Sequence, residues 1–281
     1  MPVGAAPSLV CAATEPRLLP LRLATAAMGT RFELVLGGAD PDRLRPVGEA
    51  AIGIIEESHR RLSRFAPDSL VSHINRTAFA HAVRLDGDTF DLFADALAVQ
   101  HATDGAFDIA VAGARCRSGG VLLDGRARTI RFTRADVAID LGAIAKGHAL
   151  DLAARVLREH GVSCALLHGG TSSVGAVGAP PGMAGWRIAL GRSAGARSIV
   201  LRDAALSVSG PAGPRDRDGH ALRPGHIVDP RSGKSVPGTH LIAVKGPSAR
   251  LADAWSTAIT VLGRRPPSLG PAWTMVRIEA A

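Results

Sequence analysis

The sequence predicts an α+β fold in which helices pack on mixed or antiparallel sheets. Helical and alternating segments interleave irregularly along the 281 residues, which is typical of this class. Hydrophobic residues make up 46% of the chain, enough for a substantial core. Prolines at positions 2, 7, 16 and 20 predict a loose lead-in over residues 1–20. We expect residues 21–281 to form one domain, with room for two subdomains.

The first half of the chain mixes strands and helices. Residues 31–36 alternate in polarity and stop at a Gly-Gly pair, as a half-buried strand would. The helical period predicts helices over residues 42–62 and 88–101, with Asp42 as the first N-cap. Residues 63–75 are polar and predict a loop. Further strands are expected at 106–111, 121–124, 129–133 and 137–141, the middle two as a hairpin.

The second half is expected to contain two helices among short strands. One helix covers residues 146–160 and ends at Gly161. The other begins after Ser248 as its N-cap, reaches Leu262 and ends at Gly263. The expected strands are 164–167, 186–190, 198–201, 205–208, 241–244 and 274–278.

The composition restricts the class of partner. The net charge is +8, which suits an anionic partner but also an arginine-rich codon bias. Codon bias explains it better, because no basic run exceeds two residues. Seven Phe, three Trp and no Tyr leave few rings for stacking bases, so we expect no nucleic acid. Three cysteines without a CxxC pair argue against a disulfide framework.

The N-terminus predicts a cytoplasmic location. It lacks the positively charged and continuously apolar regions of a signal peptide, and the residues before Cys11 match a lipoprotein box poorly. No stretch of 18 apolar residues occurs, so no membrane span is expected.

Two distant segments carry the strongest chemical signal. Asp140 and Lys146 flank a turn of small residues between a predicted strand and helix, a place where phosphates bind backbone N–H groups. Asp253 and Thr257 lie one helical turn apart, and such oxygen ligands suit Mg²⁺. Taken singly, each pattern is also compatible with an ordinary turn or a solvated helix face. Together they suggest a site for a divalent cation and a diphosphate.

A third segment, residues 225–233, contains His226 and Asp229. A histidine with a nearby carboxylate can transfer protons near neutral pH, although Asp-Pro followed by Ser-Gly also forms a plain turn. Gly233-Lys234-Ser235 lacks the first glycine of a P-loop. The glycines near residue 170 do not fit the dinucleotide-binding spacing.

Taken in order, these segments resemble the ApbE family, the FAD:protein FMN transferases. The match covers about residues 25–263. The matching segments are Met28–Thr30, Leu62–Ser69 with Asn75, Gly105–Asp108, Asp140–Gly147 with Asp151, Gly169-Gly170, Ser209-Gly210, His226–Pro230 and Ala252–Ala258. The resemblance implies an ApbE-like architecture related to the T-fold. It also implies Mg²⁺-dependent transfer of FMN from FAD to a Thr or Ser hydroxyl of a target protein, with release of AMP.

The resemblance also implies roles for individual residues. The positions that contact FAD are Met28, Phe65, Ala106, Phe107, Asp108, Asp140, Lys146 and Ile227. The metal positions are the Ala143 carbonyl, Asp253 and Thr257, with Ser256 beside them. The catalytic set is His226 as base, Lys146 and Asp229. Phe65 replaces a common Tyr and Ala110 replaces a common Thr, which leaves the rate and the substrate choice open.

Two other functions fit the same residues. A FAD diphosphatase would release FMN and AMP without an acceptor, and a non-catalytic FAD-binding protein would leave FAD intact. The transferase function requires that the turn near residue 143 and the helix near residue 255 fold against each other and hold one cation beside the flavin dinucleotide, and we expect this contact.

Overall fold

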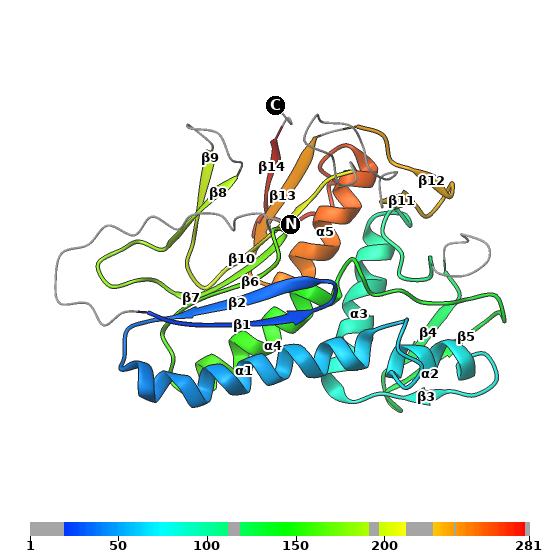
Figure 1. The fold of residues 1–281 in the computed structure, drawn as a ribbon. Helices are drawn as coiled ribbons and strands as arrows, with labels where there is room; N and C mark the ends of the chain where they lie inside the picture. The colour runs from blue at the N-terminus through cyan, green and yellow to red at the C-terminus, as the bar shows by residue number, and fades with distance from the viewer. Residues whose placement is uncertain (1–19, 112–118, 191–196, 212–226, 239, 279–281) are drawn as a thin grey trace, which may run out of the picture.

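The computed structural model describes residues 20–111, 119–190, 197–211, 227–238 and 240–278. Its centre is a seven-stranded sheet in the order β1-β2-β6-β7-β10-β13-β14 (Figure 1). Every neighbouring pair is antiparallel. The strands are β1 (Leu21–Ala27), β2 (Thr30–Leu36), β6 (Cys164–Gly169), β7 (Ser173–Gly178), β10 (Ala205–Ser209), β13 (Leu241–Gly246) and β14 (Thr274–Ile278). The predicted α+β class with antiparallel sheets is confirmed.

Helices cover one face of this sheet. They are α1 (Pro41–Leu62), α4 (Ala145–Glu159) and α5 (Ala249–Leu262). Figure 1 shows α4 in green between the blue α1 and the orange α5. A core of buried residues from the sheet, α1 and α4 includes Leu34, Ile55 and Leu150. On the other face, β8 (Trp186–Leu190) pairs with β9 (Arg197–Leu201), and both contact the sheet through buried leucines. The centre of the sheet is therefore buried on both sides.

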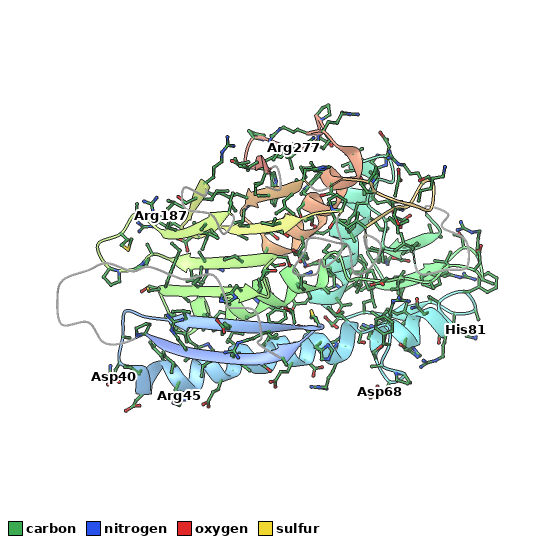
Figure 2. All side chains as sticks on the ribbon, turned by 45° about the horizontal axis from the view of Figure 1, so that its top comes forward. Asp40, Arg45, Asp68, His81, Arg187 and Arg277 are labelled. Carbon is green, nitrogen blue, oxygen red and sulfur yellow. The ribbon has the colours of Figure 1, made fainter. Side chains whose placement is uncertain are left out.

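A second layer lies beside α5. It contains α2 (Leu70–Thr77), α3 (Gly87–Ala102) and a small sheet in the order β3-β5-β4. The strands of this sheet are β3 (Val83–Arg84), β4 (Val121–Asp124) and β5 (Thr129–Phe132), and a further pair is β11 (Val228–Asp229) with β12 (Lys234–Ser235). Phe93, Ile130 and Ile259 belong to one buried cluster, which joins this layer to α5. Charged side chains such as Asp40, Arg45 and Arg277 lie at the periphery (Figure 2).

The predicted helices are confirmed, with small shifts at their ends. Ser248 caps α5 through its hydroxyl, and Gly263 ends the helix at a φ of 68°. The expected cap of α1 was wrong by two residues. The cap is Asp40, whose side chain accepts a hydrogen bond from the Asp42 N–H. Pro41 follows as the first helical residue, a position where the backbone N–H that proline lacks would have no partner within the helix.

Several expectations for strands and loops were wrong. Residues 106–111 and 137–141 form no ladder, although the Asp140 N–H donates to the Ile109 carbonyl (2.8 Å). In residues 137–141, the Asn75 side chain takes the place of a partner strand. Its Nδ2 donates to the Ile139 carbonyl (3.1 Å) and its Oδ1 accepts from the Ile139 N–H (2.8 Å). The end of the predicted loop over 63–75 is instead α2, capped by Ser69. The sequence reading also missed β1 and β7. Within the described ranges, no helix is long and apolar enough to cross a membrane.

Candidate functional site

Two adjoining cavities lie where α5, the start of α4 and the loops of the second layer meet. The larger has a volume of about 690 Å³ and the smaller about 320 Å³. Four residues line both cavities: Arg64, Asp140, Gly142 and Lys146. The turn over residues 140–146 therefore separates the two cavities and faces both.

The turn and the C-terminal helix are in direct contact, as predicted. The Gly147 N–H donates to Asp253 Oδ2 across 2.7 Å, although 106 residues separate them. Gly147 permits this approach, because a Cβ there would lie 2.1 Å from the Ala249 carbonyl oxygen. Asp151 strengthens the contact by accepting the Ser248 hydroxyl (2.7 Å) and the N–H groups at the start of α5.

Asp253 is a buried carboxylate held by neutral donors. Its side chain is 3% exposed, yet it lines the larger cavity. Oδ1 accepts the hydroxyls of Ser173 (2.7 Å) and Ser207 (2.6 Å). The ammonium of Lys146 lies 4.0 Å from Oδ2 and 3.5 Å from the Gly142 carbonyl. Its positive charge therefore faces the same cavity as the carboxylate.

The other predicted metal positions differ in their access to this cavity. Ala143 and Thr257 line it together with Asp253. Ser256 is fully buried, and its hydroxyl lies 2.7 Å from that of Ser209 and 3.1 Å from that of Ser207. Ser256 thus belongs to a hydroxyl cluster behind the cavity wall.

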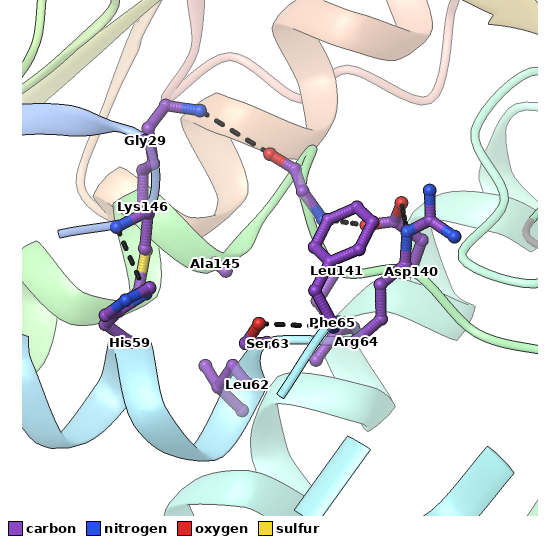
Figure 3. Close-up of a pocket in the computed structure, with 12 residues that line it drawn as sticks. Gly29, His59, Leu62, Ser63, Arg64, Phe65, Asp140, Leu141, Ala145 and Lys146 are labelled. Carbon is purple, nitrogen blue, oxygen red and sulfur yellow. Dashed lines mark hydrogen bonds and ion pairs between the residues drawn. The ribbon is translucent and has the colours of Figure 1, made fainter. Parts of the chain in front are cut away.

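The smaller cavity is more apolar and is bounded by the end of α1. His59 and Leu62 of this helix line it together with Leu141 and Lys146 (Figure 3). Met28 also lines it from the tight β1–β2 turn, with a φ of 49°, and its N–H donates to His59 Nδ1 (3.2 Å). A flat or apolar group suits such a space.

Phe65 and Arg64 form the outer edge of the smaller cavity. Phe65 is 78% exposed, and the Arg64 guanidinium carbon lies 4.3 Å from its ring centroid. Arg64 also pairs with Asp140 at 2.8 Å (Figure 3). Asp140 in turn accepts the Gly142 N–H (2.8 Å), which fixes the turn. The sequence reading did not single out Arg64 as a site residue.

The loop over residues 105–108 lines the larger cavity through Ala106, Phe107 and Asp108. Asp108 is buried and accepts the N–H groups of Ala110 (2.7 Å) and Gly119 (3.0 Å). The backbone of residue 110, which any residue provides, holds this carboxylate. The loop therefore does not depend on the buried side chain of Ala110.

The third predicted segment reaches the cavity only in part. His226 lies outside the described residues, but its neighbour Ile227 lines the larger cavity. Asp229 is not among the lining residues, and Arg231 binds its carboxylate through two nitrogens at 2.9 Å each. Those bonds hold the pKa of Asp229 below its ordinary value, despite partial burial. This carboxylate is therefore a weak proton acceptor.

The donor set fits a hard divalent cation. Among the described residues, no group of three or more His, Cys, Asp or Glu could hold a metal. Where α5 meets the turn, the cavity instead offers the Asp253 carboxylate, the Thr257 hydroxyl and the backbone at Ala143. Oxygen ligands in this small number suit Mg²⁺, which keeps several waters and also binds phosphates.

Sequence comparisons connect these residues to known proteins. The sequence pattern of the ApbE family matches residues 28–116 and 114–269. A FAD:protein FMN transferase of Klebsiella pneumoniae is 26% identical over 277 residues, covering 84% of this chain and 77% of that protein. One from Rhodobacter capsulatus is 36% identical over 142 residues. This second match spans 48% of the chain and only 26% of the Rhodobacter protein.

A solved structure shares the architecture. The crystal structure of an ApbE protein from Thermotoga maritima superimposes with a TM-score of 0.74 at 26% identity, covering 87% of each chain. The antiparallel sheet and its helices are thus a known arrangement.

Proposed function

The chain belongs to the ApbE family, and on this basis we propose that it is a transferase that moves FMN from FAD to a Ser or Thr hydroxyl of a target protein. One observation carries the proposal beyond family membership. The turn over residues 140–147 and α5 meet at a single cavity, where Lys146 and Asp253 stand 4.0 Å apart. A cationic group beside a carboxylate oxygen is what a cation–diphosphate pair requires.

The reaction breaks the phosphoanhydride bond of FAD and forms a phosphoester bond to the target. The hydroxyl oxygen of the target attacks the phosphorus of the FMN half of FAD. The bond from that phosphorus to the bridging oxygen breaks, and AMP leaves with the bridging oxygen. Negative charge grows on the phosphate oxygens during this exchange, so positive groups placed beforehand lower the barrier. Lys146, which lines the larger cavity, is assigned this role.

The residues assigned to hold Mg²⁺ are Asp253 and Thr257, with the Ala143 carbonyl. A bound Mg²⁺ would neutralise charge on the diphosphate and the leaving phosphate. Met28 and Phe65 are assigned to the flavin dinucleotide at the smaller cavity, and Arg64 joins them as an edge residue. On the larger cavity, Ala106, Phe107, Asp108, Asp140 and Ile227 are assigned to the same ligand.

The target hydroxyl needs a proton acceptor, because it is a poor nucleophile near neutral pH. We assign this role to His226 on the family resemblance, supported by the position of Ile227 in the cavity wall. Asp229, bound by Arg231, is assigned to hold the turn that follows β11 instead of taking the proton.

A labelling experiment tests the proposal. The purified chain is incubated with FAD, Mg²⁺ and a target that carries an Asp-x-x-(Ser/Thr) motif, and the denatured target is examined for flavin fluorescence and for added mass. We expect covalent FMN on the target with wild type and none with Asp253→Ala. Release of FMN and AMP with an unlabelled target would identify a FAD diphosphatase. Intact FAD after hours with Mg²⁺ would leave only flavin binding.

We also propose that the protein is cytoplasmic, as expected from the sequence. Cell fractionation with an antibody against the chain would test it, and recovery in another fraction would contradict it.

A further inference from the structure

Asp253 has fewer free positions for a ligand than its place in the cavity wall suggests. A carboxylate accepts about four hydrogen bonds, two at each oxygen. Oδ1 already accepts two, from Ser173 and Ser207, and Oδ2 accepts one from the Gly147 N–H. The remaining position is on Oδ2, the oxygen that also lies 4.0 Å from the Lys146 ammonium.

The two serines are placed as a pair by the sheet. Ser173 on β7 and Ser207 on β10 are direct partners in the antiparallel register. Side chains of such partners stand on the same face with Cβ atoms about 5 Å apart. Both hydroxyls therefore reach one carboxylate oxygen of α5, which lies above this face, at 2.7 and 2.6 Å.

The direction of the hydrogen bonds follows from the carboxylate. An ionised carboxylate only accepts, so Ser173 and Ser207 must donate to it. The single proton of Ser256 can be donated to the Ser207 oxygen (3.1 Å) or to the Asp253 carbonyl (3.0 Å), and Ser209 can donate to Ser256 (2.7 Å). Ser173 and Ser207 thus donate directly to the carboxylate, and Ser256 and Ser209 extend the polar network behind them.

We propose that Ser173 and Ser207 are positioning residues that fix the Asp253 carboxylate so that Oδ2 alone is presented to a divalent cation. This inference rests on the proposed function, because it assumes that Asp253 binds the cation. It gives Ser256 a supporting place behind Ser207. The two serines differ in their access to the cavity. Ser207 lines it, whereas Ser173 is fully buried and is not among the lining residues.

Metal affinity without FAD tests the inference. The full-length chain is titrated with Mn²⁺ alone, which prefers the same oxygen ligands as Mg²⁺, and free Mn²⁺ is counted by electron paramagnetic resonance. We expect Ser173→Ala and Ser207→Ala each to weaken Mn²⁺ binding about 10-fold or more, the usual effect of losing a partner that orients a ligand. Ser207→Thr keeps the hydroxyl, so it should bind Mn²⁺ with most of the wild-type affinity, in contrast to Ser207→Ala.

Two further variants guard against a loss of folding. Ser173→Cys keeps the volume and supplies a weaker donor, so it should fold and bind Mn²⁺ with reduced affinity. Thr260→Val is the matched control. Thr260 is buried on α5 and donates to the Ser256 carbonyl (2.8 Å), and no described hydrogen bond joins it to Asp253. Its variant should lose stability but keep the Mn²⁺ affinity of wild type.

The outcomes separate this inference from the function on which it rests. No Mn²⁺ binding by wild type, or unchanged binding by Asp253→Ala, would overturn the metal site and the inference with it. Binding that depends on Asp253 but not on Ser173 would overturn the inference alone. A loss confined to Ser207 variants would make Ser207 a direct ligand and also overturn it.

Discussion

Lys146 is the residue on which the charge balance of the cavity depends. Its ammonium contacts the Gly142 carbonyl at 3.5 Å and lies 4.0 Å from Asp253. We expect Lys146→Met to slow target labelling at least about 100-fold, the scale of losing one preorganised donor to a developing negative charge. Single-turnover labelling rates measure this.

The control for this prediction is Lys245→Met. Lys245 lies on β13, where its ammonium donates to the Val200 carbonyl, and it is not among the residues lining either cavity. Equal losses in the two variants would show that the effect comes from the charge of the whole protein and not from the site.

Phe65 offers an exposed ring at the edge of the smaller cavity. Phe65→Ala should raise the Kd for FAD about 10-fold, because stacking on a ring contributes ~1–3 kcal/mol. The free energy of unfolding of this variant should differ from that of wild type by less than ~0.5 kcal/mol, because the Phe65 ring is 78% exposed. Phe79 is 50% exposed and lines neither cavity, so Phe79→Ala should leave the Kd unchanged. Flavin fluorescence titration compares the two.

At the scale of the elements, the α4–α5 contact sets the geometry of the site. A Cβ at Gly147 would meet the Ala249 carbonyl carbon at 2.3 Å, so Gly147→Ala must push the helices apart. We expect a loss of ~1–3 kcal/mol in the free energy of unfolding, together with weaker Mn²⁺ binding. Denaturant unfolding measures the first effect.

A matched glycine inside another helix gives the opposite expectation. Gly53 lies within α1, and nothing stands within 4 Å of a Cβ placed there. Gly53→Ala should therefore stabilise the protein by ~0.5–1 kcal/mol. If Gly147→Ala behaved in the same way, the close contact of α4 and α5 would be wrong.

The elements also show what the sequence could and could not predict. The ends of α5 were predictable, because Ser248 and Gly263 act within one helical turn. Residues 137–141 carry a strand pattern, but the partner that satisfies Ile139 is the side chain of Asn75, 64 residues away. The polarity pattern of a short segment cannot show a partner so far away in the sequence, so the expected strand was wrong.

The candidate site shows the same division. Asp253 and Thr257 were recognisable from their helical spacing and the family resemblance. Ser173 and Ser207 were not, because they reach Asp253 only through the pairing of β7 with β10. Their alignment depends on the register of the sheet, which no short segment of the sequence contains.

At the scale of the whole molecule, the buried His148 predicts a pH dependence of stability. Burial, and then the charge of Arg250, lower its pKa to about 4 from 6.5, against the opposing effect of Asp88 and Asp86. The folded chain therefore holds His148 neutral where the unfolded chain binds a proton. Stability should be complete above pH 6.5 and fall as the pH drops from 6.5 toward 4.

The variant His148→Met should flatten the profile in this window. The slope that it removes is at most about 1.4 kcal/mol per pH unit, the value for one proton. Denaturant midpoints measured across the window report it. His81 is exposed on the surface (Figure 2), and His81→Met should follow the wild-type profile. A wild-type slope in His148→Met would contradict the assignment.

The claim that one cation sits between the turn over residues 140–147 and α5 is best tested by anomalous diffraction from crystals grown with Mn²⁺ and FAD. We predict a single strong peak within coordination distance of Asp253 Oδ2, the Thr257 hydroxyl and the Ala143 carbonyl. A peak elsewhere in the cavities, or none in crystals that show bound FAD, would contradict this account.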